Sequence, residues 1–250
     1  MATQSKHELS VIGFPKCGTS ALMRIVEKDP RVYVVRTGND SLEIPPKDLE
    51  GYRESAPACD VLAHKFVARA FTSQGTQELL QLNSEMSLVL CYRHPVKSLI
   101  SWHNMHTKIA VTGRNKNHFA YKERDFYATA SLSEYYERYA KERLCYDVHI
   151  GRLLETVPSS QLTIIAQEEL AAAPDETGEA LLNFVRTGER KKVCAGGSTA
   201  HRGYADKKRN SIEIPAEITE ELEGIYSRTQ SLLGAADVTF EMEPAQATAV

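Results

Sequence analysis

Short apolar runs alternate with longer amphipathic stretches along this chain. Five runs bounded by polar residues have the length and composition of buried strands, namely LSVIGF, RVYVVR, DVLAHKF, SLVLCY and QLTIIAQ. Helical periodicity fills most of the intervals between them. This alternation predicts an α/β fold with a central parallel β-sheet flanked by helices. No linker divides the sequence, so we expect a single domain over residues 1–242 and a disordered tail over residues 243–250.

Two strand-to-helix turns stand out in this pattern. Thr19 or Ser20 can cap a helix over ALMRIVEKD, which Pro30 stops. Pro95 suits the first position of a helix over PVKSLISWHNM, directly after the run SLVLCY. Ligands of open α/β sheets bind at the carboxyl ends of strands, and both turns lie there.

Two stretches in the second half of the chain have less regular patterns. Residues 107–127, TKIAVTGRNKNHFAYKERDFY, are polar and weakly periodic, which predicts a long excursion or lid over the site. The helical pattern SLSEYYERYAKERLCYDVHIGRLLETV follows, and we expect Tyr135, Tyr139 and Tyr146 to pack that helix. A further helix is predicted over PAEITEELEGIYSRTQSLL.

Composition narrows the functional classes. The chain has 250 residues, 42% of them hydrophobic, which is enough to bury a core of ordinary size. Its net charge of −3 and pI near 6.3 argue against a general polyanion-binding surface such as a nucleic-acid interface, while a local basic cluster is still allowed. The five cysteines are scattered without ligand spacing, which predicts neither disulfides nor zinc. The polar N-terminus, and the absence of any run of about 18 apolar residues, predict a cytoplasmic protein without a membrane span.

The turn VIGFPKCGTSAL has the composition of an anion-binding loop. Unpaired N–H groups at a helix N-terminus attract negative charge, and Gly18 allows the backbone to approach a phosphate closely. Lys16 adds a cation at the same point. The order of residues differs from the triphosphatase pattern GxxxxGK[ST], because the lysine precedes the glycine. The pattern therefore weakens the hypothesis of a magnesium-dependent kinase.

The same residues resemble a loop of a known family. FPKCGTSAL is similar to the 5′-phosphosulfate loop of sulfotransferases that use 3′-phosphoadenosine 5′-phosphosulfate (PAPS). The resemblance implies the P-loop nucleotide-hydrolase-like sulfotransferase fold, with PAPS as donor, adenosine 3′,5′-bisphosphate (PAP) as product and no required metal. It also implies a set of donor-binding residues in the loop: Lys16, Cys17, Gly18, Thr19, Ser20 and Ala21.

A second signature of the family is also present. RHPVKSLIS places Arg93, Pro95 and Ser101 at the family's spacing. Arg93 at a strand end and Ser101 on the following helix can converge on one 3′-phosphate through charge-assisted hydrogen bonds. Further along, IIAQEELAAAPDETGEALLNFV resembles a scaffold segment of the family. HRGYADKKRN, with Arg202 and Gly203, resembles the basic loop over the 3′-phosphate, and a solvated charge run is the alternative.

The chemistry of sulfuryl transfer needs positive charge at the leaving oxygens and a base near the attacking hydroxyl. Lys16 is the residue that we expect at the bridging oxygen. SLEIPPKDLEGY resembles the carbohydrate-modifying branch, with Glu43 at the position of the base, and LAHKFVARAF keeps that branch's Lys65. In the cytosolic small-molecule branch a histidine is the base, which makes His64 the alternative. We prefer Glu43.

The sequence therefore predicts a PAPS-dependent sulfotransferase acting on a hydroxyl of a carbohydrate or small-molecule acceptor. Two other functions remain open: a nucleotide kinase on a similar fold, and an inactive relative that keeps the nucleotide pocket. Retention of Lys16, Arg93 and Ser101 favours an active enzyme. The acceptor and the oligomeric state do not follow from the sequence.

Overall fold

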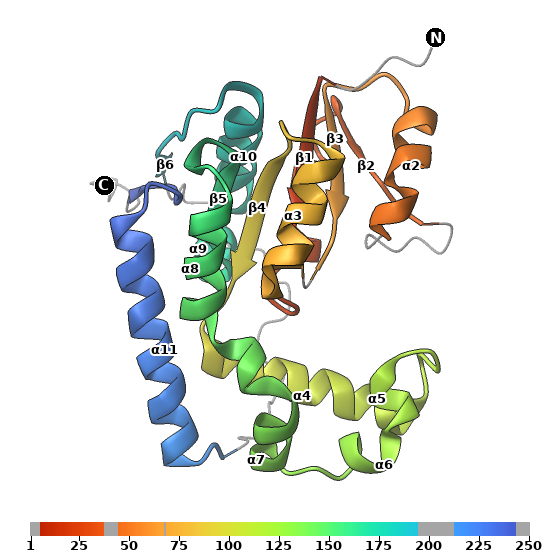
Figure 1. The fold of residues 1–250 in the computed structure, drawn as a ribbon, viewed down its shortest axis with the longest axis vertical. Coiled ribbons are helices and arrows are strands. Elements are labelled where there is room, and N and C mark those ends of the chain that lie inside the picture. Colours follow the sequence, from red (N-terminus) through yellow and green to blue (C-terminus); the bar gives the residue numbers. More distant parts are fainter. Residues whose placement is uncertain (1–5, 38–44, 68, 195–212, 244–250) are drawn as a thin grey trace, which may run out of the picture. The chain divides into compact units, whose positions relative to one another are not determined.

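The computed structural model describes residues 6–37, 45–67, 69–194 and 213–243 (Figure 1). The chain divides into two compact units. The first unit comprises Met1–Tyr92, Arg152–Arg202 and Leu233–Val250, and the second comprises Arg93–Gly151 and Gly203–Leu232. The single domain over residues 1–242 stays a prediction.

A parallel sheet of five strands forms the centre of the first unit. Its strands are β1 (His7–Val11), β2 (Val32–Val34), β3 (Val61–Lys65), β4 (Ser87–Tyr92) and β5 (Leu162–Ala166). The order is β2-β3-β1-β4-β5, and every neighbouring pair is parallel. Strands β2 to β5 fall within the predicted apolar runs, whereas β1 begins at His7, two residues before the run LSVIGF, and ends within it. The α/β class with a central parallel sheet flanked by helices is confirmed.

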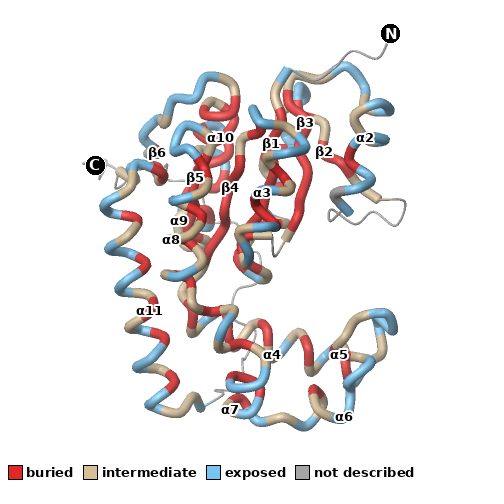
Figure 2. Tube along the Cα trace, viewed as in Figure 1, coloured by how far each residue is buried: buried red, intermediate tan, exposed pale blue. Residues whose placement is uncertain are grey.

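Helices cover both faces of this sheet, which explains why the strands are apolar almost throughout (Figure 2). One face packs against α1 (Thr19–Val26) and α10 (Pro174–Thr187). The other contacts α2 (Leu49–Ser55) and the end of α3 (Ser73–Leu82) through the side chain of Glu8. Shorter elements complete the unit: η1 (Pro46–Asp48), η2 (Arg69–Phe71), η5 (Ser159–Gln161), α9 (Gln167–Ala172), and the paired strands β6 (Val193–Cys194) and β7 (Met242–Glu243).

The second unit is helical. It contains α4 (Pro95–Thr112), α5 (Phe119–Lys122), α6 (Arg124–Tyr127), α7 (Leu132–Tyr135), the π-helical turn η3 (Tyr136–Ala140) and the 3-10 turn η4 (Glu142–Leu144). Two longer helices, α8 (Tyr146–Thr156) and α11 (Ala216–Ala235), contribute residues to both units. Helix α11 confirms the helix predicted in that region. None of the helices in the described ranges combines the length and the apolar character needed to cross a bilayer.

Two helix predictions in this unit are corrected by the structure. Helix α4 continues past Met105 to Thr112, because the buried stripe of Trp102, His106 and Ala110 continues, and it ends where Gly113 adopts φ +62°. Residues 107–127 are therefore largely helical, and their role as a lid is untested. Residues 131–157 do not form one regular helix.

The helical pattern in residues 131–157 is interrupted where buried aromatic side chains cluster. Tyr135 and Tyr136 are consecutive and both buried, and the wider π-helical turn that begins at Tyr136 interrupts the regular α-helical spacing of buried side chains. The hydroxyl of Tyr135 lies 2.8 Å from Nδ1 of His106. Burial, with His118, Arg143 and His103 nearby, lowers the pKa of His106 to about 3, so its imidazole is neutral. Tyr135 and Tyr146 do pack the core, as predicted.

A buried charged cluster lies on the sheet face that contacts α2 and the end of α3. Arg53 donates to the two carboxylate oxygens of Glu8 at 2.9 and 2.8 Å, and Asn83 donates at 2.6 Å. His64, which is fully buried, places Nε2 at 3.5 Å from the same carboxylate. Burial opposes ionisation of Glu8, but the contacts with His64, Arg53 and Asn83 lower its pKa from 4.5 to about 2.

The main chain approaches strand β4 closely just after β1 ends. The ladder with β4 continues beyond the strand, because Ile12 N donates to Val89 O and Phe14 N donates to Cys91 O, at 2.9 and 3.0 Å. A Cβ atom on Gly13 would lie 2.7 Å from the backbone N and O of Cys91 and 2.7 Å from the Thr19 methyl. Only glycine allows this approach.

We therefore expect Gly13→Ala to lower the free energy of unfolding by about 1–3 kcal/mol, because the added methyl separates β1 from β4 or displaces Thr19. Urea unfolding followed by circular dichroism measures this change. Gly51→Ala is the matched control, since nothing lies within 4 Å of the added atom and alanine favours the helix. Equal stability of the Gly13→Ala and wild-type proteins would contradict the described packing.

Acid should weaken the fold through Glu8. Because its folded pKa of about 2 lies below the ordinary 4.5, the Glu8 contribution is complete above pH 4.5 and is lost as the pH falls toward 2. Glu8→Gln should cost about 1.5–3 kcal/mol at neutral pH and make stability less sensitive to acid over that range. Urea titrations at several pH values test this. The exposed Glu85→Gln change is the control, and an acid sensitivity of Glu8→Gln equal to that of the wild type would refute the assignment.

Candidate anion-binding site

The loop after β1 has an unusual backbone. Lys16 adopts φ +65° and Gly18 adopts φ +89°, both in the left-handed region. For a residue with a side chain, this conformation costs roughly 1–2 kcal/mol. Cys17 N donates to Phe14 O at 3.3 Å within the turn, and the Cys17 side chain is buried. Such strain at a non-glycine residue points to a functional constraint at Lys16.

The left-handed turn leaves backbone donors open at the start of α1. Ala21 N and Leu22 N donate to Gly18 O at 2.9 and 3.0 Å. Over the described part of the chain, the amides of Gly18, Thr19 and Ser20 reach no acceptor. Consecutive unsatisfied amides at the positive end of a helix form an anion-binding geometry.

The capping prediction for this helix was wrong. The N-cap is Gly18, not Thr19 or Ser20, and no side chain caps the helix. The physical reason is that Gly18 already turns the chain into the helix, so Thr19 becomes its first residue. Thr19 is buried, and its methyl group faces Gly13. The hydroxyl of Ser20 is left to interact elsewhere.

Two lysines give this loop positive charge. Lys16 is exposed, whereas Lys65, at the carboxyl end of β3, is 8% exposed and donates from Nζ to Ser20 Oγ at 3.1 Å. Because the Ser20 oxygen accepts this bond, its O–H remains able to donate to an anion. Lys65 was predicted as a site residue, but its contact with Ser20 was not predicted from the sequence. Ala21 is exposed on the first turn of α1.

Two further residues support the loop from neighbouring elements. The rings of Phe14 and Phe71 lie 5.3 Å apart. Gln167, the first residue of α9, lies against Gly18, where an added Cβ would be 3.1 Å from Gln167 Cγ. Its Oε1 is buried, and no partner for it occurs among the described residues. Gln167 was not among the residues predicted from the sequence, although its position as a polar residue directly after β5 is a signal that could have identified it.

The second motif lies in the second unit. Arg93 follows β4 directly and is half-buried, and Pro95 begins α4 as predicted. His94 is the N-cap residue, with its Nε2 atom 3.3 Å from Glu223 Oε2 and its ring 4.4 Å from that of Tyr226. Ser101 lies in the second turn of α4 and is partly exposed. The structure thus places a guanidinium and a hydroxyl near the start of one helix.

Of the two residues predicted as candidate bases, the structure describes His64 but not Glu43. His64 presents no ring nitrogen to solvent and faces Glu8 and the ring of Phe66, 4.7 Å away. Burial lowers the pKa of His64 despite the neighbouring carboxylate. Glu43 lies outside the described residues, as do Arg202, Gly203 and the tail from residue 244.

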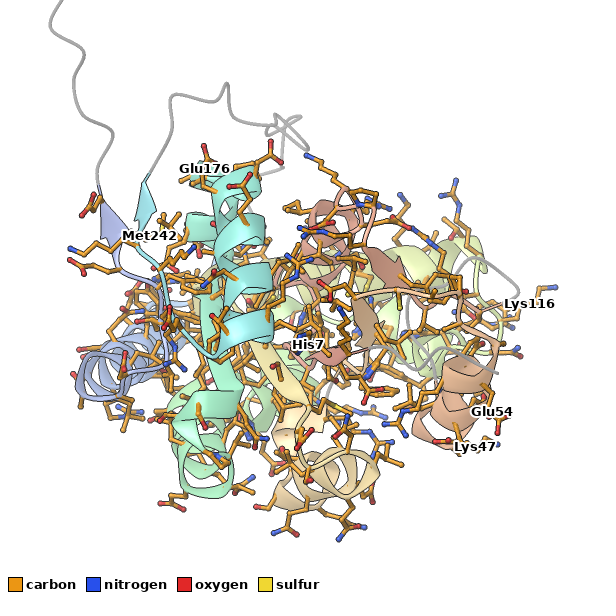
Figure 3. All side chains as sticks on the ribbon, turned by 90° about the horizontal axis from the view of Figure 1, so that it is seen from above. His7, Lys47, Glu54, Lys116, Glu176 and Met242 are labelled. Carbon is orange, nitrogen blue, oxygen red and sulfur yellow. The ribbon has the colours of Figure 1, made fainter. Side chains whose placement is uncertain are left out.

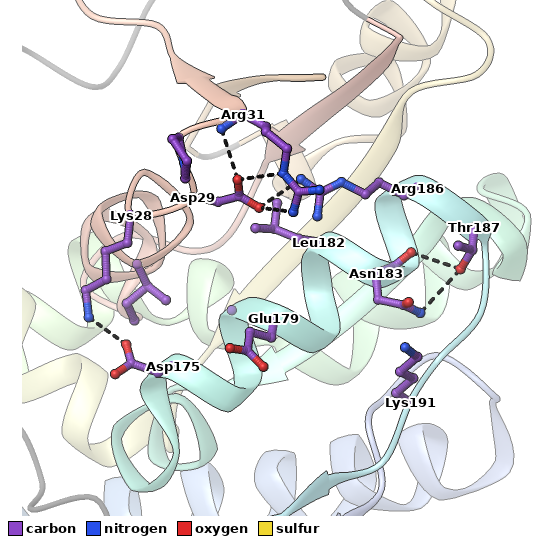
Figure 4. Close-up of a pocket in the computed structure, with 13 residues that line it drawn as sticks. Lys28, Asp29, Arg31, Asp175, Glu179, Leu182, Asn183, Arg186, Thr187 and Lys191 are labelled. Atoms are coloured by element: carbon purple, nitrogen blue, oxygen red, sulfur yellow. Dashed lines mark hydrogen bonds and ion pairs between the residues drawn. The ribbon is translucent and has the colours of Figure 1, made fainter. Parts of the chain in front are cut away.

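A cavity of about 760 Å³ lies along the end of α1 and along α10 in the first unit (Figure 4). Its lining includes no residue of the loop at 14–20. Lys28 pairs with Asp175, and Arg31 and Arg186 both pair with Asp29. Because carboxylates neutralise these cations, the cavity has less uncompensated positive charge than its lysines and arginines suggest. In the described ranges, no three His, Cys, Asp or Glu side chains are grouped so that they could hold a metal ion.

Comparisons with known proteins bear on the fold. No family model matches the sequence, and no curated protein sequence matches it. The crystal structure of a sulfotransferase from Alicyclobacillus acidocaldarius is similar, with a TM-score of 0.59 and 16% identity over 92% of this chain and 96% of that chain. The sulfotransferase domain from the curacin biosynthetic pathway aligns with a TM-score of 0.47 and 14% identity, over 96% of this chain and 100% of that chain. The first likeness shows that this chain has the α/β fold of a sulfotransferase.

Proposed function

We propose that this protein is a PAPS-dependent sulfotransferase that moves the sulfuryl group to a hydroxyl of a carbohydrate or small-molecule acceptor. One observation carries the proposal: three open amides, a left-handed Lys16 and a buried Lys65 gather at one loop, in a chain with the fold of a sulfotransferase. As part of the proposal, the protein acts in the cytoplasm.

The loop binds the 5′ end of the donor. The amides of Gly18, Thr19 and Ser20 donate to phosphate oxygens, and the Ser20 hydroxyl, oriented by Lys65, adds a further donor. Lys16 stabilises the negative charge that develops on the leaving phosphate. PAPS supplies the sulfuryl group, and the product PAP retains both of its phosphates.

The motif after β4 binds the 3′-phosphate. Arg93 offers a planar fork of N–H donors that fits two phosphate oxygens, and Ser101 offers one hydroxyl. Arg202 and Gly203 are proposed to contact the same phosphate.

Transfer follows an in-line displacement. The acceptor oxygen bonds to sulfur as the bond between sulfur and the bridging oxygen breaks, and the acceptor proton passes to a base. We assign the base to Glu43. The enclosed position of His64 supports this choice, since a base must approach the acceptor hydroxyl within hydrogen-bond distance.

Removing the Lys16 side chain should abolish transfer without unfolding the protein. We expect Lys16→Ala to lower kcat by about 10²- to 10³-fold, because charge stabilisation at the leaving oxygen is lost. Lys16→Gly provides the sharper test. It removes the same amine and relieves the left-handed strain, so it should be as inactive and at least as stable as the wild type.

Transfer from radiolabelled PAPS to a panel of hydroxyl acceptors, with thermal unfolding alongside, measures both effects. Lys28→Ala, which removes an exposed lysine bonded to Asp175, is the control. Wild-type rates in a folded Lys16→Gly protein would remove Lys16 from the mechanism.

Donor binding is the first experiment to perform. Calorimetric titration with PAP should show metal-independent binding that Arg93→Ala weakens by about 10- to 100-fold, because a charge-assisted contact to the 3′-phosphate is lost. Arg138→Ala, which removes an exposed arginine paired with Glu123 in the same unit, should bind PAP normally.

ATP with magnesium serves as the competing ligand in the same titration. If the protein binds ATP only with magnesium and fails to bind PAP, the loop accepts a triphosphate and the kinase hypothesis replaces the sulfotransferase. If PAP binds tightly but no acceptor is sulfated, the protein is a nucleotide-binding relative without this activity.

A further inference from the structure

The first residue of α9 lies against the loop that follows β1. Because β1 and β5 belong to one parallel sheet, the loop after β1 and the start of α9 after β5 occupy the same edge of that sheet. His7, labelled in Figure 3, marks the other end of β1. A Cβ atom on Gly18 would lie 3.1 Å from Gln167 Cγ, 3.8 Å from Gln167 Cβ and 3.5 Å from Leu170 Cδ2. The side chain of Gln167 therefore packs directly on Gly18.

Unpaired hydrogen-bonding groups from two elements meet at this contact. The carboxamide of Gln167 has no hydrogen bond within the described part of the chain, and its Oε1 atom is buried. The amides of Gly18, Thr19 and Ser20 reach no acceptor there either. Buried polar groups without a partner are uncommon, because they lose their hydrogen bonds to water on folding. The unpaired groups of α9 and of the loop therefore form one set.

The shape of the carboxamide determines which of its edges can meet a ligand. Oxygen and nitrogen lie on opposite sides of the same carbon, and the nitrogen carries two N–H donors. Because Oε1 of Gln167 is enclosed, the edge that can face a ligand is the one with Nε2. Nε2 is two bonds from Cγ, the atom in contact with Gly18. An anion held by the open amides is therefore within reach of this further donor.

The neutrality of Gln167 matters, because the two residues that follow it are acidic. Glu169 turns back toward its own helix, where its Oε2 atom accepts from Ala166 N at 3.2 Å. A carboxylate at position 167 would itself accept hydrogen bonds from the open amides and would repel a phosphate. A carboxamide has nearly the same shape, but it carries no charge and adds a donor. Position 167 thus suits an anion-binding role only with the amide in place.

We propose that Gln167 is a further residue of the PAPS site, whose Nε2 atom donates a hydrogen bond to the 5′-phosphate. This inference rests on the proposed sulfotransferase function and deepens it. The 5′-phosphate stays with the product PAP, so the contact exists both before and during transfer. It stabilises bound substrate and transition state alike, which lowers KM for PAPS and leaves kcat unchanged.

Two substitutions separate the hydrogen bond from the packing. Gln167→Met keeps the methylenes against Gly18 but has no N–H donor, so the affinity for PAP in calorimetry should fall about 10-fold. Gln167→Glu should lower this affinity about 100-fold, because the carboxylate repels the phosphate and competes for the amides. In the transfer assay, Gln167→Met should raise KM for PAPS by a similar factor and keep kcat. Thermal unfolding of both variants should match that of the wild type.

The controls use a matched ligand and a matched glutamine. Adenosine 3′-monophosphate lacks the 5′-phosphate, so Gln167→Met should bind it as the wild type does. Gln77→Met and Gln77→Glu make the same chemical changes at an exposed position of α3 in the first unit, and both should bind PAP normally. Wild-type affinity of Gln167→Met for PAP would reduce Gln167 to packing. An equal loss for the 3′-monophosphate would assign it to the nucleoside. Either result would overturn the inference.

Failure of this inference is distinguishable from failure of the proposed function. If the wild type and Gln167→Met bind PAP equally, the PAPS site stands without Gln167. If the wild type fails to bind PAP, the PAPS assignment falls, and inorganic pyrophosphate becomes the probe of the loop. Weaker pyrophosphate binding by Gln167→Met than by the wild type would keep Gln167 as an anion-binding residue. Equal pyrophosphate binding, or none, would remove it from the loop's function.

Discussion

The close approach of the backbone at Gly13 to strand β4 is the constraint on which the site depends. Hydrogen bonds from Ile12 and Phe14 to β4 hold the chain in line with the sheet beyond the end of β1. The chain must then reverse before α1 begins at Thr19, and it does so through the left-handed conformations of Lys16 and Gly18. Among the described residues, that path leaves the amides of Gly18, Thr19 and Ser20 without an acceptor. The strain at Lys16 and the open amides are therefore two results of one backbone path.

The alternation of side chains in β3 separates two residues that are adjacent in sequence. His64 and Lys65 point to opposite faces of the sheet. Lys65 reaches Ser20 on the face covered by α1, while His64 faces Glu8 on the face that contacts α2. The motif AHKF does not reveal this difference. Every residue of β3 is buried, so its sequence has no apolar–polar alternation that would show which face of the sheet each side chain occupies. Lys65 therefore contacts the loop after β1, whereas His64 lies in the buried cluster around Glu8.

Much of the first unit could be predicted because its physical signals are local. Strands buried on both faces read as continuous apolar runs. In the second unit, Pro95 is a similar local signal for the start of α4. Other features depend on contacts between distant segments. The contact of Gln167 with Gly18 joins α9 to the first loop, and strands β6 and β7 are each two residues long. Such elements have no pattern of their own to detect.

The net charge of −3 does not describe every part of the chain, because residues 107–127 contain five lysines and arginines but only two carboxylates. Exposed ion pairs contribute only about 0–1 kcal/mol each, so an unpaired surface cation costs the fold little. Mutual repulsion is also modest, because salt screens charges beyond about 8 Å. The fold therefore tolerates, at little cost, exposed cations such as Lys108 and Lys116, which have no ion-pair partner in the described ranges. Glu123, the acidic residue next to Lys122, bonds to Arg138 at 2.6 Å, so Lys122 has no carboxylate partner among the described residues.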